Sequence, residues 1–162
     1  MSDSSATLRD PRERVSTRAP WLWAVGALTL VVIVAAAAVV ADLIWLDVPW
    51  WAWTAYAVVA IGYVVTMPVY RYRVHRWEST ETAVYTQRGW LARERRIAPM
   101  SRVQTVDLEQ GPIARLAGLA QVTVTTASAA GPLRIEGLDL PVAQRLVDDL
   151  TRRTAAERGD AT

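Results

Sequence analysis

Few residues in this chain of 162 could carry out catalytic chemistry. His75 is the single histidine, and the sequence contains neither cysteine nor lysine. These absences exclude a multi-histidine metal site, a thiol nucleophile and a phosphate loop of the Walker type. No serine lies in a Gly-x-Ser-x-Gly elbow. Because no nucleophile, base and orienting group can be combined, the sequence predicts a protein that is not an enzyme and binds no cofactor.

Two pairs of carboxylates are the remaining candidates for a cation site. Asp107 and Glu109 are two residues apart in an expected strand and therefore share a face, while Asp148 and Asp149 are neighbours in an expected helix. Solvated carboxylates on the surface are the more common interpretation of such pairs. We therefore predict no metal site. The arginines on either side of His75 should disfavour its charged form.

All 18 basic residues are arginine, and five of them form the most distinctive polar group in the sequence. This group, the Arg cluster, consists of Arg88, Arg93, Arg95, Arg96 and Arg102. Near the inner leaflet of a membrane, each arginine close to anionic lipid would contribute about 1 kcal/mol. The cluster therefore predicts a contact with lipid or with a protein partner. The alternative is a solvated strand face that pairs with Asp107 and Glu109.

A nucleic-acid partner is not expected. From Arg71 onward the chain has 14 arginines against 11 acidic residues, so this part is only mildly basic.

Two long apolar segments must position these residues at a membrane. Residues 21–41 contain no charge, and residues 50–70 form a second uncharged run. Each has the roughly 20 residues needed to cross a bilayer core of ~30 Å. We predict transmembrane helices over about 21–43 and 50–70, which are antiparallel because the loop around Asp47 is so short. Asp42 should lie near the far interface because a charge is costly in hydrocarbon.

Aromatic residues are concentrated at both ends of the two predicted spans, as expected for rings that prefer the headgroup level. The predicted interface anchors are Trp21, Trp23, Trp45, Trp50, Trp51, Trp53, Tyr70 and Tyr72.

The distribution of arginine predicts the orientation of the hairpin. Arginines precede the first span and follow the second, whereas the connecting loop has none. Positively charged flanks stay in the cytoplasm, so we expect a multi-pass protein of the plasma membrane with both termini cytoplasmic. A cleaved signal peptide ending near Ala41 is the alternative. It is disfavoured by the length of the apolar run and by the second span that follows at once.

Residues 71–153 have the pattern of one compact soluble domain. Short Val- and Thr-rich segments alternate with turn residues, which predicts a small antiparallel β domain. The expected strands are Tyr72–Glu78, Ala83–Gln87, Trp90–Ala98, Val103–Glu109, Ala120–Thr126 and Pro132–Glu136. Val142, Leu146 and Leu150 recur at helical spacing and predict a closing amphipathic helix. Residues 1–20 and 154–162 are polar and are expected to be a disordered N-terminal tail and a flexible C-terminal tail.

Several motifs in this domain occur in a fixed order. They are Arg95-Arg96-Ile97-Ala98-Pro99, Arg102-Val103-Gln104-Thr105-Val106, Gln110-Gly111-Pro112-Ile113-Ala114-Arg115-Leu116-Ala117-Gly118-Leu119-Ala120 and Val122-Thr123-Val124-Thr125-Thr126-Ala127. In the third motif, Ile113 and Leu116 share one face of a short helical turn, Gly118 permits the positive φ that ends it, and Leu119 can return to the core. We interpret this motif as structural.

Together these motifs resemble the bacterial pleckstrin-homology (PH) domain family of the YdbS type, and the two preceding spans match its usual architecture. The resemblance implies an α+β fold: a transmembrane hairpin, then a bent antiparallel β barrel or sandwich of about seven strands closed by a C-terminal helix. It implies no catalytic residues. Members of the family often occur beside a larger relative with several PH-like repeats, which suggests a membrane protein of that kind as partner; homo-oligomerisation is left open. The spacing of the Arg cluster does not reproduce the basic motif of eukaryotic PH domains.

Two functions are consistent with these features. The first is a non-catalytic module, tethered to the bilayer, that binds a protein partner at the cytoplasmic face. The alternative is a lipid-contacting or transport-associated component acting through the Arg cluster or the hairpin. Few polar residues lie within the spans, which favours the first, because intramembrane charge is what marks a translocation path.

Overall fold

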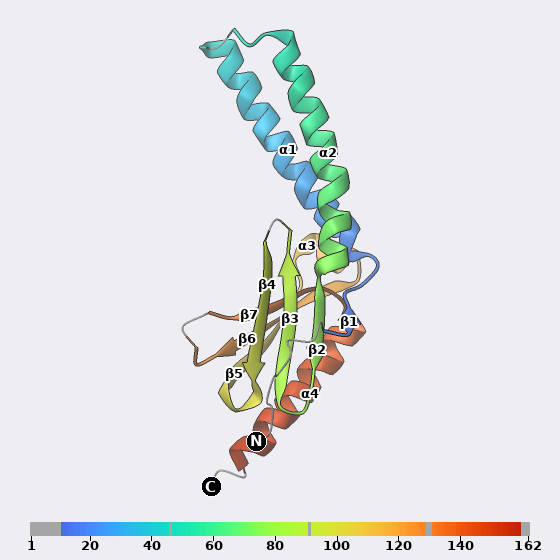
Figure 1. Cartoon of the computed structure of the whole chain (residues 1–162), viewed down its shortest axis with the longest axis vertical. Helices are drawn as coiled ribbons and strands as arrows, with labels where there is room; N and C mark the ends of the chain where they lie inside the picture. Colours follow the sequence, from blue (N-terminus) through green and yellow to red (C-terminus); the bar gives the residue numbers. More distant parts are fainter. Residues whose placement is uncertain (1–10, 46, 91, 129–130, 160–162) are drawn as a thin grey trace, which may run out of the picture.

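Two long antiparallel helices project from one end of a β domain (Figure 1). The computed structural model describes residues 11–45, 47–90, 92–128 and 131–159. Helix α1 (Ala19–Ile44) and helix α2 (Trp50–Val74) have 26 and 25 residues, enough to span a membrane, and the rest of the protein buries almost none of their apolar surface. The two helices predicted from the sequence are thus present, and both are long and apolar enough to cross a membrane.

The second helix is longer than the predicted segment 50–70. Arg71 and Arg73 lie in its last turn, where basic side chains interact favourably with the helix dipole. The helix therefore continues to Val74, and the strand expected from Tyr72 begins only at Arg76.

Polar groups within the hairpin are satisfied locally. The Val48 N–H donates to the Asp42 carboxylate (2.7 Å), which ties the short loop to the end of α1 as expected of a charge at the far end of the span. The Tyr56 hydroxyl donates to the Val31 carbonyl oxygen (2.5 Å) and links the two helices midway.

The β domain is an open sandwich of two antiparallel sheets. Its described elements are β1 (Glu13–Arg14), β2 (Arg76–Ser79), β3 (Ala83–Gly89), β4 (Arg93–Pro99), η1 (Met100–Arg102), β5 (Val103–Glu109), α3 (Pro112–Leu116), β6 (Leu119–Thr126), β7 (Leu133–Asp139) and α4 (Leu140–Gly159). One sheet has the order β1-β2-β3-β4 and the other β5-β6-β7. The sheets do not close into a barrel, so the predicted PH-like architecture is confirmed in its sandwich form.

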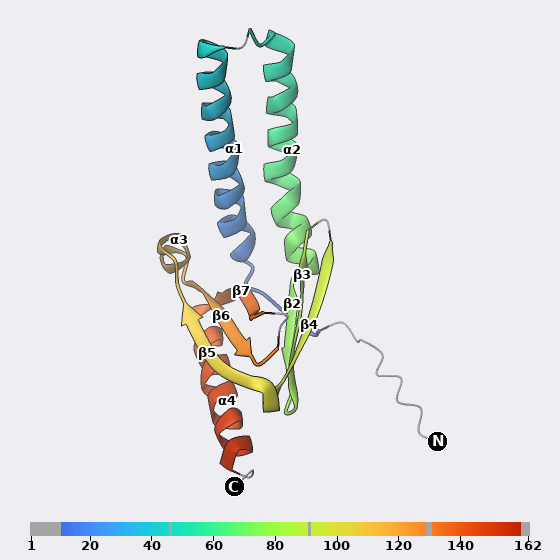
Figure 2. The same ribbon diagram turned by 90° about the vertical axis from the view of Figure 1, so that its left-hand side faces the viewer.

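Helix α4 packs across the β5-β6-β7 sheet (Figure 2). Ala143, Leu146 and Leu150 lie on one face of the helix and are at most 5% exposed. Val122 and Val124 are fully buried on β6, the central strand of that sheet. The predicted amphipathic helix is thus confirmed, although it extends to Gly159, well into the segment that we expected to be a flexible tail from residue 154.

The expectation of a disordered tail over residues 1–20 is wrong for residues 11–20. Glu13 and Arg14 pair with Trp77 and Arg76 as strand β1, which is the strand missing from the sequence interpretation. Val15 is 3% exposed, and α1 begins at Ala19. The hairpin is therefore inserted between two adjacent strands of the domain. Residues 1–10 and 160–162, which were expected to belong to the two tails, lie outside the described residues.

Candidate functional site

The hairpin meets the β domain around Trp23. This ring is 6% exposed, and the Arg71 guanidinium carbon lies 4.5 Å from its centroid. Arg71 also forms an ion pair with Glu136 on β7. Trp23 was predicted to be a membrane-interface anchor, but the structure places it inside the joint between α1, α2 and β7. Its spacing in the sequence could not distinguish headgroup from protein contact.

Two further contacts hold the segment just before α1 against β7. The Ser16 hydroxyl donates to Asp139 (2.7 Å), and the Ser16 N–H donates to the Gly137 carbonyl oxygen (2.8 Å). Gly137 has a φ of +74°, and a Cβ at this position would lie 2.6 Å from the Ala19 Cβ. The joint therefore depends on a residue without a side chain.

His75 is buried in the same joint. It is 2% exposed, and its ring centroid lies 5.3 Å from that of Trp23. Burial, with the nearby charges of Arg71 and Arg88, lowers the pKa of His75 from 6.5 to about 4. The direction expected from neighbouring arginines is confirmed, but burial, which the sequence did not reveal, contributes most.

This lowered pKa predicts that the folded protein loses stability in mild acid. The unfolded state takes up a proton below about pH 6.5, whereas folded His75 stays neutral until about pH 4. The free energy of unfolding should therefore fall as the pH drops through this window, by at most about 3 kcal/mol. His75→Gln should remove this component. Denaturant unfolding of both proteins in detergent between pH 7 and pH 4.5 measures the difference, and equal slopes would contradict the assignment.

The Arg cluster is divided by the fold. Arg88 and Arg96 both form ion pairs with Glu94, and the Arg88 Nε lies 2.8 Å from the carboxylate. The hydrogen bond from Arg88 and then the one from Arg96 contribute most to lowering the pKa of the Glu94 carboxyl. The Arg95 Nε donates to the Gln87 side chain (2.9 Å). Glu94 is thus the carboxylate that pairs with Arg88 and Arg96. The alternative of a solvated strand face had assigned this role to Asp107 and Glu109.

The remaining two arginines of the cluster lie far apart. Arg93 is exposed where β4 begins, beside the hairpin, whereas Arg102 is exposed in η1 at the opposite end of the domain (Figure 1). A single surface does not hold all five. Contact of the cluster with lipid stays a prediction.

Carboxylates of both acidic pairs bind neighbouring side chains of the protein. Asp107 accepts a hydrogen bond from Thr105 and Glu109 accepts one from Gln121, while Asp149 pairs with Arg153 (2.7 Å). Among the described residues, no three histidine or acidic side chains are grouped as metal ligands require.

Three of the predicted interface anchors are exposed at the loop end of the hairpin. Trp45, Trp50 and Trp51 are 61–84% exposed there. Trp53, in the same turn of α2, is half-buried. At the domain end, Trp21 is 77% exposed, Tyr70 is partly exposed and Tyr72 is half-buried.

Trp90, which the sequence interpretation assigned only to a strand, also belongs to the domain end. It packs against Tyr70 and Tyr63 of α2, with centroid separations of 5.8 and 6.1 Å.

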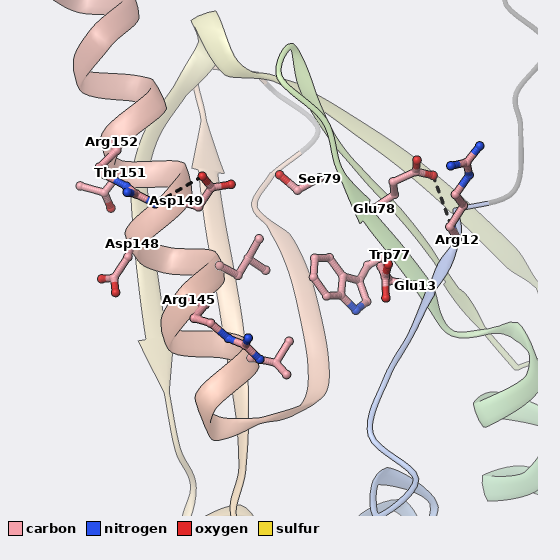
Figure 3. Close-up of a pocket in the computed structure, with 12 residues that line it drawn as sticks. Arg12, Glu13, Trp77, Glu78, Ser79, Arg145, Asp148, Asp149, Thr151 and Arg152 are labelled. Carbon is pink, nitrogen blue, oxygen red and sulfur yellow. Dashed lines mark hydrogen bonds and ion pairs between the residues drawn. The ribbon is translucent and has the colours of Figure 1, made fainter.

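A groove of about 1040 Å³ separates α4 from the β1–β2 edge (Figure 3). It is lined by Arg12, Glu13, Trp77, Glu78, Ser79, Val142, Arg145, Leu146, Asp148, Asp149, Thr151 and Arg152. Trp77 and Ser79 point into the space between strand and helix, and their Nε1 and Oγ atoms are buried without a hydrogen-bond partner among the described residues. The sequence analysis could not reveal this groove, because one of its walls is strand β1, which was not predicted.

A two-sheet antiparallel sandwich crossed by a C-terminal helix, carried on two apolar helices, defines a membrane-anchored protein of the PH-like class. The model of the bacterial PH domain family matches residues 19–154, and the chain belongs to that family. The match begins at α1, so strand β1 lies outside it.

A curated relative covers nearly the same length. The chain is 31% identical over 151 residues to the UPF0699 transmembrane protein YdbS of Bacillus subtilis (strain 168), which is 88% of this chain and 92% of the relative. No solved structure matches the chain. The resemblance inferred from the motifs is confirmed.

Proposed function

We propose that the protein is a non-catalytic, membrane-tethered PH-like module whose groove between α4 and the β1–β2 edge binds a segment of a protein partner. The partner that fits the family context is a membrane protein, such as a larger relative with several PH-like repeats. The observation that carries the proposal is the open groove itself, about 1040 Å³ in volume, with α4 on one side and the β1–β2 edge on the other.

The composition of the groove favours a peptide segment over a small ligand. Both walls carry arginines and carboxylates, and Leu146 and Val142 of α4 contribute apolar surface. Small-molecule sites are mostly apolar and enclosed, whereas charge of both signs around an apolar centre is typical of a protein interface.

Affinity purification of the full chain in a mild detergent, followed by mass spectrometry, tests this function. Arg145→Glu reverses one charge of the groove and should reduce the recovered partner at least tenfold, because the electrostatic match is lost. Arg134→Glu is the matched control, since Arg134 is exposed on β7 and does not line the groove. Equal loss in both variants, or in neither, would contradict binding in the groove.

We also propose that both termini lie in the cytoplasm and that the membrane is the plasma membrane. The support is the arginine asymmetry: α1 follows Arg18, α2 ends with Arg71 and Arg73, and the loop has no basic residue.

This topology predicts which positions react with an impermeant thiol reagent in intact cells. Because the chain has no cysteine, single substitutions report cleanly. Val48→Cys in the loop should react, whereas Ser4→Cys and Thr162→Cys should react only after the cells are lysed. Labelling of either terminus in intact cells would contradict the proposed orientation.

The structure gives the alternative of a transport component little support. The hydroxyls of Thr29, Thr54 and Thr66 each donate to the carbonyl oxygen four residues earlier in their own helix. Polar groups that line a translocation path would be expected to face a cavity instead.

A further inference from the structure

Helix α3 carries two apolar side chains that the domain does not bury. Ile113 is 49% exposed and Leu116 is 90% exposed. Among the large apolar side chains of the described residues, Leu116 is the most exposed, above Trp45 on the hairpin at 84%. The neighbouring Leu119, which returns to the core as expected, is fully buried. The turn formed by α3 therefore accounts for the burial of Leu119 and the positive φ of Gly118. It does not account for the exposure of Ile113 and Leu116.

The position of α3 relative to the hairpin suggests what covers these side chains. An Arg18 guanidinium nitrogen lies 3.4 Å from the Ala117 carbonyl oxygen, at the end of α3. Leu22 and Trp23 of α1 line a small pocket together with Gly111 and Ala114. Figure 2 shows α3 beside the first turns of α1. The helix therefore lies at the level of the first turns of α1, where that helix leaves the domain.

We propose that the side chains of Ile113 and Leu116 insert into the headgroup region of the bilayer beside α1. Arg115, which is exposed between them, has the length to reach lipid phosphates from the same level. Apolar and basic side chains on one short element are the combination that binds at a membrane interface. The bilayer is favoured over a second protein because α3 continues the surface of a membrane-spanning helix.

On the other side of the hairpin the domain reaches the same level through the β3–β4 turn. Trp90 in this turn contacts Tyr63, which lies two helical turns further into α2 than Tyr70. With α3 beside α1 and Trp90 beside α2, the domain has a contact on each flank of the hairpin. Two such contacts would fix the tilt of the domain against the membrane and keep the groove at α4 in a defined orientation.

Fluorescence quenching of the full chain tests this insertion. Leu116→Cys is labelled with an environment-sensitive fluorophore and reconstituted at one chain per nanodisc of phosphatidylcholine and phosphatidylglycerol. Ser101→Cys is the control, because Ser101 is exposed in η1 at the end of the domain away from the hairpin. The label at position 116 should be quenched by nitroxide on the lipid headgroup and at least threefold less than the control by aqueous iodide.

Two other outcomes would overturn the proposal. Equal quenching by iodide at positions 116 and 101 would place α3 in water. Protection from both iodide and the lipid nitroxide would place Leu116 against protein. Neither outcome depends on whether a partner binds the groove, so this test and that of the proposed function can fail separately.

Discussion

Gly137→Ala should lower the free energy of unfolding of the full chain by about 2–5 kcal/mol. A φ of +74° is unfavourable for a residue with a Cβ by roughly 1–2 kcal/mol. The added carbon would also lie 2.6 Å from the Ala19 Cβ, and such overpacking costs about 1–3 kcal/mol more. Since Ala19 opens α1, the strain falls on the joint between the hairpin and the domain. Thermal and denaturant unfolding in detergent, followed by tryptophan fluorescence, measures the loss.

Gly131→Ala separates the two contributions. Gly131 has nearly the same φ, +77°, but a Cβ there would meet open space. Its substitution should therefore cost only the conformational part, roughly 1–2 kcal/mol. Limited proteolysis provides an independent measurement, because a loosened joint should expose residues 11–18 in Gly137→Ala and not in Gly131→Ala. Equal stability of the two variants would show that Ala19 does not pack closely on β7.

The elements that could be predicted from the sequence are those with long or strictly periodic patterns. Two uncharged runs of about 20 residues identify α1 and α2, and alternation around Val122 and Val124 identifies β6. Strand β1 has only two residues, too few for a period of two to be visible. Its pairing partner β2 lies about 60 residues further along the chain, beyond the hairpin. That contact follows from the tertiary fold and not from any local pattern.

The site was less predictable because its contacts cross between elements. The pairing of Arg88 with Glu94 depends on the register of β3 and β4, which sets these residues directly opposite each other. Trp23 and Trp21 are indistinguishable as interfacial aromatics in the sequence, yet the helical turn directs one toward His75 and leaves the other exposed. The exposure of Leu116 was hidden for the same reason, since its spacing from Ile113 also suits a buried turn.

Helix α4 forms one layer of the domain and one wall of the groove, so its apolar face should be sensitive to charge. Leu146→Asp should destabilise the protein by about 4–5 kcal/mol, near the top of the range for point substitutions. Leu146 is 5% exposed, so the substitution removes buried apolar area and places a carboxylate largely out of water against the apolar face of the sheet. Because domains of this size are stable by only about 5–15 kcal/mol, the melting temperature should fall sharply.

Gln144→Asp is the matched control for this effect. Gln144 is exposed on the same helix, two residues before Leu146. Its replacement by Asp therefore introduces the same carboxylate at a similar distance from the start of the helix. Its effect should stay within about 0.5 kcal/mol, as for surface substitutions in general. The difference between the two melting curves therefore isolates burial from helix propensity and charge. A wild-type melting curve for Leu146→Asp would mean that α4 does not pack on the sheet through this face, and the wall that it gives to the groove would then be lost as well.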